Sequence, residues 1–252
     1  MSDKKIDMER YLKGILAQKG GGLFILIDPD RGSPLELAKL AALSAELGAD
    51  AILIGSSILL NDDLSETVRS IKSTTGIPVF LFPGNGQQIT PGVDGILFLS
   101  LISGRNPRWL IEEQVEAAPR IKAMGIPVLP TGYMIIESGR VTAVEFMSGT
   151  VPIPRDKPDI AAAHAIAAGM LGMKALFLEA GSGAEKSVPP EMVAAVKRAS
   201  DLPLIVGGGI REIGQAEKIA SAGADFIVIG NAIEKTGNTG FISEIASIIH
   251  RK

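Results

Sequence analysis

The chain has 252 residues, of which 46% are hydrophobic, 21% are charged and only 4% are aromatic. This length accommodates one large α/β domain or two small ones, and the abundance of aliphatic side chains suits a core shared by parallel strands and covering helices. The formal net charge of -3, without a long basic run, argues against a nucleic-acid partner. The chain has no cysteine, so disulfides, thiol nucleophiles and zinc–cysteine sites are excluded and any metal is expected on oxygen ligands.

Short runs of isoleucine, valine and leucine recur, each followed by glycine, proline, aspartate or serine and then by a helical pattern. This order is typical of repeated βα units. The predicted strands are residues 23–28, 51–55, 79–82, 95–99, 128–130, 175–179, 204–206 and 226–230. Eight parallel strands are the number that closes a TIM (β/α)8 barrel, so residues 1–252 are predicted to form a single barrel domain.

Two departures from a regular barrel are predicted. Residues 83–95, PGNGQQITPGVDG, are rich in glycine and proline and lack a helical period, so a loop is expected to replace the third helix. Residues 134–150 are predicted to form a β-hairpin inserted after strand five, with the turn ESGRVT between MII and AVEF.

Two glycine-containing motifs follow the last two strands. GGGIRE, residues 207–212, and GNAIEK, residues 230–235, each precede a predicted helix. In barrels of this type phosphate commonly binds at these loops, because glycines let backbone N–H groups approach its oxygens. We therefore expect a substrate that carries phosphate; the alternative is that the glycines serve only tight turns.

Polar side chains at three other strand ends are expected at the same rim. Asp28, in IDPDRG, is predicted to point into the barrel mouth, where a carboxylate suits Mg²⁺, and Ser57 is expected to add a hydroxyl or to act through water. Asp30 is interpreted as a cap of the following helix. Glu179, in FLEAGSG, is expected to accept a hydrogen bond from a substrate hydroxyl, because no basic partner is obvious nearby.

Apolar residues crowd the other half of the predicted mouth, which suggests a substrate with a charged head and an apolar tail. They are Ile58, Leu59, Leu60, Phe98, Leu99 and Leu101.

A series of motifs along the chain resembles the geranylgeranylglyceryl phosphate synthase family, the PcrB-like prenyltransferases. In chain order the motifs are IDPDRG, IGSS, FPGNG, SLISGRNPRWLI, LPTGYMI, IPRDKPDIAAAHAIAAG, LFLEAGSG, VGGGIR and IGNAIEKTG. The resemblance spans residues 23–237, and the run through NPRWLI is similar to the larger second group of the family. It implies sn-glycerol 1-phosphate as acceptor, a polyprenyl diphosphate as donor, most simply geranylgeranyl diphosphate, and an ether lipid precursor as product.

The resemblance also assigns roles to residues. Asp28 and Ser57 match its magnesium positions, with Asp28 and Glu179 as the implied catalytic pair. The implied glycerol phosphate positions are Phe177, Leu178, Glu179, Ala180, Gly181, Ser182, Gly183, Gly208, Gly209, Gly230 and Asn231. Phe177 stands where the family commonly has tyrosine, and Leu26 where some members have lysine, so a hydrogen bond and a cationic contact are missing here.

Alternatives follow from the same phosphate loops. A sugar phosphate isomerase or epimerase needs an acid–base pair, for which only Glu179 and Asp28 are available, and a non-catalytic phosphometabolite-binding barrel needs neither.

Residues 1–14 lack the apolar core of a signal peptide, and no run of about 18 apolar residues occurs. We therefore expect a cytoplasmic protein without a transmembrane segment. The family resemblance implies a homo-oligomer, either a dimer or a hexamer. Because the implied product is a lipid, transient contact with a membrane is also expected.

Overall fold

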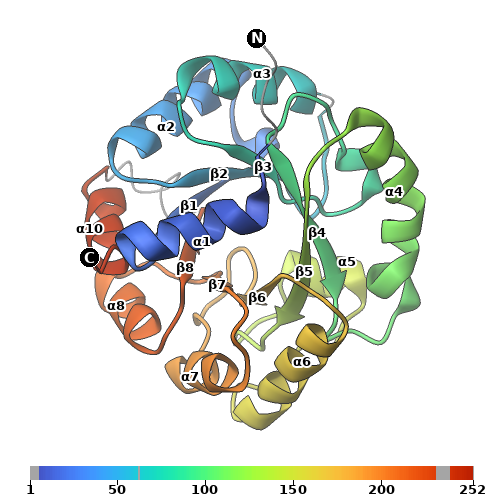
Figure 1. Ribbon diagram of the computed structural model, residues 1–252, viewed down its shortest axis with the longest axis vertical. Helices are drawn as coiled ribbons and strands as arrows, with labels where there is room; N and C mark the ends of the chain where they lie inside the picture. The colour runs from blue at the N-terminus through green and yellow to red at the C-terminus, as the bar shows by residue number, and fades with distance from the viewer. Residues whose placement is uncertain (1–5, 62, 231–238, 252) are drawn as a thin grey trace.

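The computed structural model describes residues 6–61, 63–230 and 239–251. Its centre is a closed barrel in which all neighbouring strands are parallel and β8 pairs with β1 (Figure 1). The strands are β1 Gly22–Ile27, β2 Ala51–Ile54, β3 Val79–Leu81, β4 Gly95–Leu101, β5 Val128–Ile135, β6 Ala175–Glu179, β7 Leu204–Gly207 and β8 Phe226–Ile229. The predicted TIM barrel is confirmed.

Helices surround the barrel. The α-helices are α1 Met8–Lys19, α2 Pro34–Glu46, α3 Leu64–Thr74, α4 Glu113–Met124, α5 Ala143–Ser148, α6 Pro158–Met170, α7 Pro190–Ala199, α8 Ile213–Ser221 and α10 Thr239–Ile249. Two 3₁₀ turns, η1 Pro29–Arg31 and η2 Gly86–Gln88, and a π-helix, η3 Arg108–Glu112, lie in the loops. None of the helices in the described ranges is long and apolar enough to cross a bilayer.

The hydrophobic core has two layers, because successive side chains of a strand point to opposite faces. One layer fills the barrel interior and contains the aromatic rings of Phe24, Phe80, Phe177 and Phe226. The other lies between the strands and the outer helices and is mostly aliphatic. The composition predicted this second layer, which accounts for the low aromatic content.

Helix α1 closes the N-terminal end of the barrel, and in Figure 1 it lies across the strands. Its buried residues Met8, Leu12 and Ile15 pack into the interior layer. Gly95, the first residue of β4, accommodates this contact, because a Cβ there would overlap the sulfur of Met8. The strand ends opposite α1 are therefore the end left open for a site.

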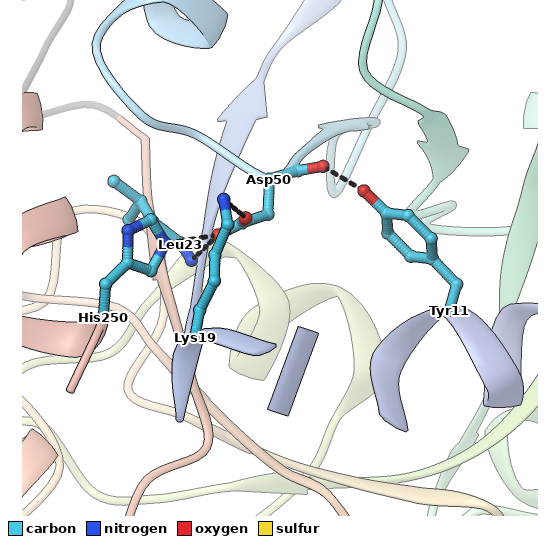
Figure 2. Close-up of polar contacts among 5 residues, drawn as sticks. All are labelled: Tyr11, Lys19, Leu23, Asp50 and His250. Atoms are coloured by element: carbon cyan, nitrogen blue, oxygen red, sulfur yellow. Dashed lines mark hydrogen bonds and ion pairs between the residues drawn. The ribbon is translucent and has the colours of Figure 1, made fainter. Parts of the chain in front are cut away.

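Asp50, at the start of β2, connects both ends of the chain to the barrel (Figure 2). Its buried carboxylate accepts hydrogen bonds from Lys19 Nζ at 2.6 Å and from the backbone N–H of Leu23 at 2.8 Å, and it lies 2.9 Å from His250 Nε2. The Tyr11 hydroxyl donates to the Asp50 carbonyl oxygen at 2.6 Å. The cluster lies at the N-terminal end of the barrel, where side chains serve stability rather than binding.

The predicted loop in place of a helix after the third strand is confirmed. Residues 82–94 contain only the short turn η2, and β3 pairs with β4 at just two positions, Phe80 with Gly95 and Leu81 with Ile96. By contrast, β4 pairs with β5 along its length, from Ile96 to Leu101. Strand β3 ends at Leu81, so the edge of β4 beyond Ile96 is not paired with β3.

The predicted hairpin after strand five is wrong. Strand β5 continues to Ile135, residues AVEFMS form α5, and the chain returns through a parallel bridge between Ile136 and Ile153. Over six residues an amphipathic helical turn and an alternating strand give the same apolar pattern, which explains the error. The short helix α5 instead lies near the barrel mouth, where Val144 and Met147 line the cavity described next.

Candidate active site

The C-terminal ends of the strands surround a cavity of about 630 Å³. Its polar side is formed by the loops that follow β1, β2, β6 and β7 and by Gly230 after β8. Its apolar side is lined by Phe82, Ile96, Phe98, Ala117, Ile121 and Met147. One cavity therefore joins carboxylates and glycine-rich loops to an extended apolar surface.

Glu179 is the last residue of β6 and is buried at the cavity wall. Burial raises the pKa of its carboxyl to about 7, although the backbone N–H of Gly181, which donates to Oε1 at 2.6 Å, acts in the opposite direction. The pKa of Tyr133 is also raised, first by burial and then by the charge of Glu179. A carboxyl group with a pKa near neutrality can accept a proton at physiological pH, which suits a general base.

The glycines after β7 bring the backbone close to this carboxyl group. Gly208 and Gly209 have φ values of +82° and +69°, in the left-handed region. A Cβ on Gly208 would overlap Glu179 Oε1 and lie 2.6 Å from the backbone nitrogen of Gly181. Only glycine fits between the loops after β6 and β7, so the motif is needed for close approach as well as for its turn.

Asp28 follows β1 and lines the same cavity. Its Oδ1 accepts the backbone N–H of Asp30 at 3.0 Å, and its Oδ2 accepts the Ser56 hydroxyl at 3.3 Å. Arg31 Nε lies 3.5 Å from Oδ2. Ser57 also lines the cavity, so the carboxylate and the hydroxyl predicted to hold a metal face one space.

The interpretation of Asp30 as a helix cap is wrong. Helix α2 is capped by Ser33, which forms a reciprocal capping box with Glu36. The Asp30 carboxylate instead accepts the backbone N–H groups of Leu60 and Asn61, at 2.8 and 3.0 Å. It therefore connects the loop after β1 to the loop after β2 and fixes the rim on which Asp28 and Ser57 lie.

Most residues predicted at the site line this cavity: Asp28, Ser57, Glu179, Gly181, Ser182, Gly183, Gly208, Gly209 and Gly230. Phe177, Leu178 and Ala180 are fully buried and are not among its lining residues. Leu178 and Ala180 face the outer layer, whereas Phe177 lies in the barrel interior and stacks on Phe82 at 5.1 Å between ring centroids. Asn231 lies outside the described residues.

Two arginines that the sequence reasoning did not assign also line the cavity, Arg31 and Arg211. Arg211 is separated from the glycines of GGGIRE by one residue, Ile210, and its Nη2 donates to the carbonyl oxygen of Ala184 at 2.5 Å. A cation close after a glycine-rich loop is itself a signal for an anionic ligand, so Arg211 could have been predicted. Arg31 could be placed only once the loops were seen together.

The apolar part of the cavity reaches both faces of β4. Leu97, Leu99 and Leu101 border it on the interior side, while Ile96 and Phe98 border it on the side facing α4. The cavity therefore passes the edge of β4 where β3 no longer pairs with it. Because no α-helix lies between β3 and β4, there is room here for this apolar part of the cavity, which we call the apolar branch.

Comparison with known proteins agrees with this geometry. The profile of the PcrB family matches residues 15–248. The chain belongs to the PcrB family. This PcrB-family chain is 44% identical over 243 residues, 96% of its length and 94% of the relative, to geranylgeranylglyceryl phosphate synthase of Chitinophaga pinensis. It is 48% identical to the synthase of Thermococcus kodakarensis, over 85% of each chain.

A solved structure shares the fold over nearly the whole chain. It is (S)-3-O-geranylgeranylglyceryl phosphate synthase of Thermoplasma acidophilum in complex with sn-glycerol-1-phosphate, with a TM-score of 0.90 and 33% identity. The alignment covers 96% of the PcrB-family chain and 98% of that structure. The expected family is therefore confirmed.

Proposed function

We propose that the protein is a prenyltransferase that joins sn-glycerol 1-phosphate to a polyprenyl diphosphate, geranylgeranyl diphosphate in the first instance. The observation that carries the proposal is the single cavity in which Glu179 and the glycine loops adjoin a long apolar branch. A phosphosugar isomerase needs only the polar part. An acceptor with a phosphate and a donor with a long tail use both parts.

The acceptor is placed by its phosphate. Backbone N–H groups around Gly208 and Gly209 and the guanidinium of Arg211 face the polar side and would hold the anion. The glycerol then extends toward Glu179, whose Oε1 is already oriented by the backbone N–H of Gly181. Glu179 would accept a hydrogen bond from the hydroxyl that attacks.

In the reaction, the 3-hydroxyl oxygen of glycerol phosphate forms a bond to the first carbon of the prenyl chain. The bond from that carbon to the diphosphate oxygen breaks, and the diphosphate leaves with the electron pair. The hydroxyl proton passes to the Glu179 carboxylate. Because an allylic carbon ionises readily, stabilising the leaving group should contribute more than proton removal.

Mg²⁺ fits the residues on the other wall. The Asp28 carboxylate and the Ser57 hydroxyl are oxygen donors, and Mg²⁺ characteristically takes its remaining ligands from water and substrate phosphate. The described residues contain no group of three or more histidine and acidic side chains suited to a metal, so the substrate would supply much of the coordination. When bound, the ion would neutralise charge on the departing diphosphate.

We also propose a homo-oligomer. Apolar side chains are exposed on α5, on the loop after it and at the end of α6, among them Phe146, Val151, Met170 and Leu171. Large exposed apolar residues favour burial against another subunit. Light scattering of the purified protein should therefore give a mass above that of one chain.

The activity is tested by incubating the purified protein with sn-glycerol 1-phosphate, labelled geranylgeranyl diphosphate and Mg²⁺. Label should enter the organic phase as an ether-linked phosphate. The control reactions replace the acceptor with sn-glycerol 3-phosphate or add a chelator. If neither geranylgeranyl nor heptaprenyl diphosphate gives organic-phase product, the proposed activity is refuted.

A further inference from the structure

A side-chain amide lies between the loops that follow β2 and β3. It belongs to Gln88, the last residue of the turn η2, which is only 1% exposed. Its Nε2 donates to the carbonyl oxygen of Ser56 at 2.8 Å, and its Oε1 accepts the backbone N–H groups of Ser56 at 3.3 Å and Gly84 at 3.1 Å. Because a carbonyl can only accept and an N–H can only donate, the orientation of this amide is determined.

The amide takes the place of a peptide group of a neighbouring strand. Regular pairing of β2 with β3 ends at Ile54 and Leu81, and the N–H of Phe82 then donates to the Ile54 carbonyl oxygen at 2.9 Å. Beyond that point, Ser56 hydrogen bonds to the Gln88 side chain through both its N–H and its carbonyl oxygen. A side-chain amide has the same donor and acceptor groups as the backbone, so Gln88 continues the pairing past the ends of the strands.

The turn that carries Gln88 is itself held in place. The backbone N–H of Gly86 donates to Oε2 of Glu113 on α4 at 2.8 Å. The backbone N–H of Gln88 donates to the carbonyl oxygen of Asn85 at 3.2 Å. The amide is therefore presented to Ser56 from a turn whose own backbone is already tied to a helix and to itself.

Ser56 connects Gln88 to the rim on which Mg²⁺ is proposed to bind. The Ser56 hydroxyl donates to Oδ2 of Asp28 at 3.3 Å, and the next residue, Ser57, lines the cavity. Without the amide, the N–H groups of Ser56 and Gly84 and the Ser56 carbonyl oxygen would lose their partners, and the loop would have to move to satisfy them. Such a movement displaces both the hydrogen-bond donor to Asp28 and the Ser57 hydroxyl.

We propose that Gln88 is a positioning residue for the metal-binding rim. It is not among the described residues that line the cavity, and it acts by fixing Ser56 and Ser57 relative to Asp28. Outer partners of this kind set metal affinity by orienting the ligands. The inference rests on the proposed prenyltransferase function and its Mg²⁺, because it concerns the residues that would hold that ion.

The test replaces Gln88 with methionine, which has similar length and no amide. The Mg²⁺ concentration that gives half-maximal turnover should rise about tenfold, whereas turnover at saturating Mg²⁺ should approach that of the wild type. KM for glycerol 1-phosphate at saturating Mg²⁺ should be unchanged, because the acceptor binds beside Glu179. Gln87→Met is the matched control: it makes the same substitution in the same turn, at an exposed residue that is not among the described cavity residues, and it should keep the wild-type Mg²⁺ dependence.

A second measurement needs no turnover. The dissociation constant of geranylgeranyl thiolodiphosphate, an unreactive analogue of the donor, is measured by calorimetry at low and at high Mg²⁺. Gln88→Met should bind the analogue more weakly than the wild type at low Mg²⁺ and equally well at high Mg²⁺. Gln87→Met should bind it as the wild type does at both concentrations.

A Gln88→Met enzyme that keeps the wild-type Mg²⁺ dependence in both measurements overturns the inference, whatever its melting temperature. So does turnover that is lowered equally at all Mg²⁺ concentrations, because that result indicates a general structural role. If the variant does not fold, as judged by circular dichroism, Gln88→Leu is measured in its place, and loss of the fold in both overturns the inference as well. Wild-type protein that binds the analogue in a Mg²⁺-dependent way but forms no product refutes the proposed activity alone, whereas prenyl transfer that is independent of Mg²⁺ refutes the inference and leaves the activity standing.

Discussion

Replacing Glu179 with glutamine should make the protein more stable at alkaline pH. Glutamine has the same shape and retains an oxygen for the N–H of Gly181. Burial raises the pKa of Glu179 from its ordinary 4.5 to about 7, so the folded state binds a proton that the unfolded state has already released over this range. A difference of this size corresponds to about 3 kcal/mol once the carboxyl is ionised in both states.

The sign follows from the direction of the shift. Below about pH 4.5 both states are protonated, and the charge of Glu179 contributes nothing to stability. Between pH 4.5 and 7 the unfolded state loses this proton while the folded state retains it, because a carboxylate is unfavourable in the desolvated position, so the free energy of unfolding of the wild type falls relative to that of the variant. The stability gained by Glu179→Gln should therefore grow between pH 4.5 and 7 and remain constant above that range.

The assay is urea unfolding followed by circular dichroism at pH 5, 6, 7 and 8, without substrate. Prenyl transfer by the variant should be reduced under all these conditions, though no more than by Asp28→Asn, while wild-type activity should increase with pH through about 7 as the base ionises. If the difference in unfolding free energy is the same at pH 5 and pH 8, Glu179 does not titrate as the buried site requires, and the assignment of a tuned base is refuted.

Three further substitutions test other parts of the molecule. Gly208→Ala should reduce kcat/KM by about a hundredfold, because its Cβ would displace Glu179 Oε1; Gly14→Ala, in an open helical position, should leave activity unchanged. Asp28→Asn should reduce turnover at limiting Mg²⁺ by about tenfold or more, with partial recovery at high Mg²⁺, and full turnover at limiting metal would reject the metal role. Asp50→Ala should lower the free energy of unfolding by about 3 kcal/mol in thermal or urea melts, against about 0.5 kcal/mol or less for Lys13→Ala in an exposed ion pair.

Most of the strands could be predicted because they are short apolar runs that end in, or are followed within two residues by, a glycine, a proline or an acidic residue. The same rule placed Asp28, Glu179 and the glycines correctly, since parallel strands of a barrel all finish at one rim. Helix α1 has a helical period in Met8, Leu12 and Ile15 that could have been recognised. Its position across the end of the barrel could not be predicted, because periodicity identifies the buried face of a helix but not the element against which that face packs.

Alternation along β6 determines which of its side chains can face the cavity. Phe177 and Glu179 lie two residues apart and share the interior face, whereas Leu178 and Ala180 face the helices. The period of two could therefore have predicted from the sequence alone that the side chains of Leu178 and Ala180 point away from the cavity. Phe177 lies on the correct face but one layer deeper, beneath Phe82, and depth along a strand depends on barrel stagger that a single sequence does not reveal.

The absence of an α-helix between β3 and β4 is consistent with the proposed combination of substrates. The interior of an eight-stranded barrel is filled by its own side chains, here including stacked aromatic rings, so it cannot receive a long tail. Space for a tail is expected beside the edge of β4 beyond Ile96, because β3 ends at Leu81 and pairs with β4 at only two positions. Opening the wall exposes strand carbonyls, which need donors, and Gln114 supplies one to Leu99.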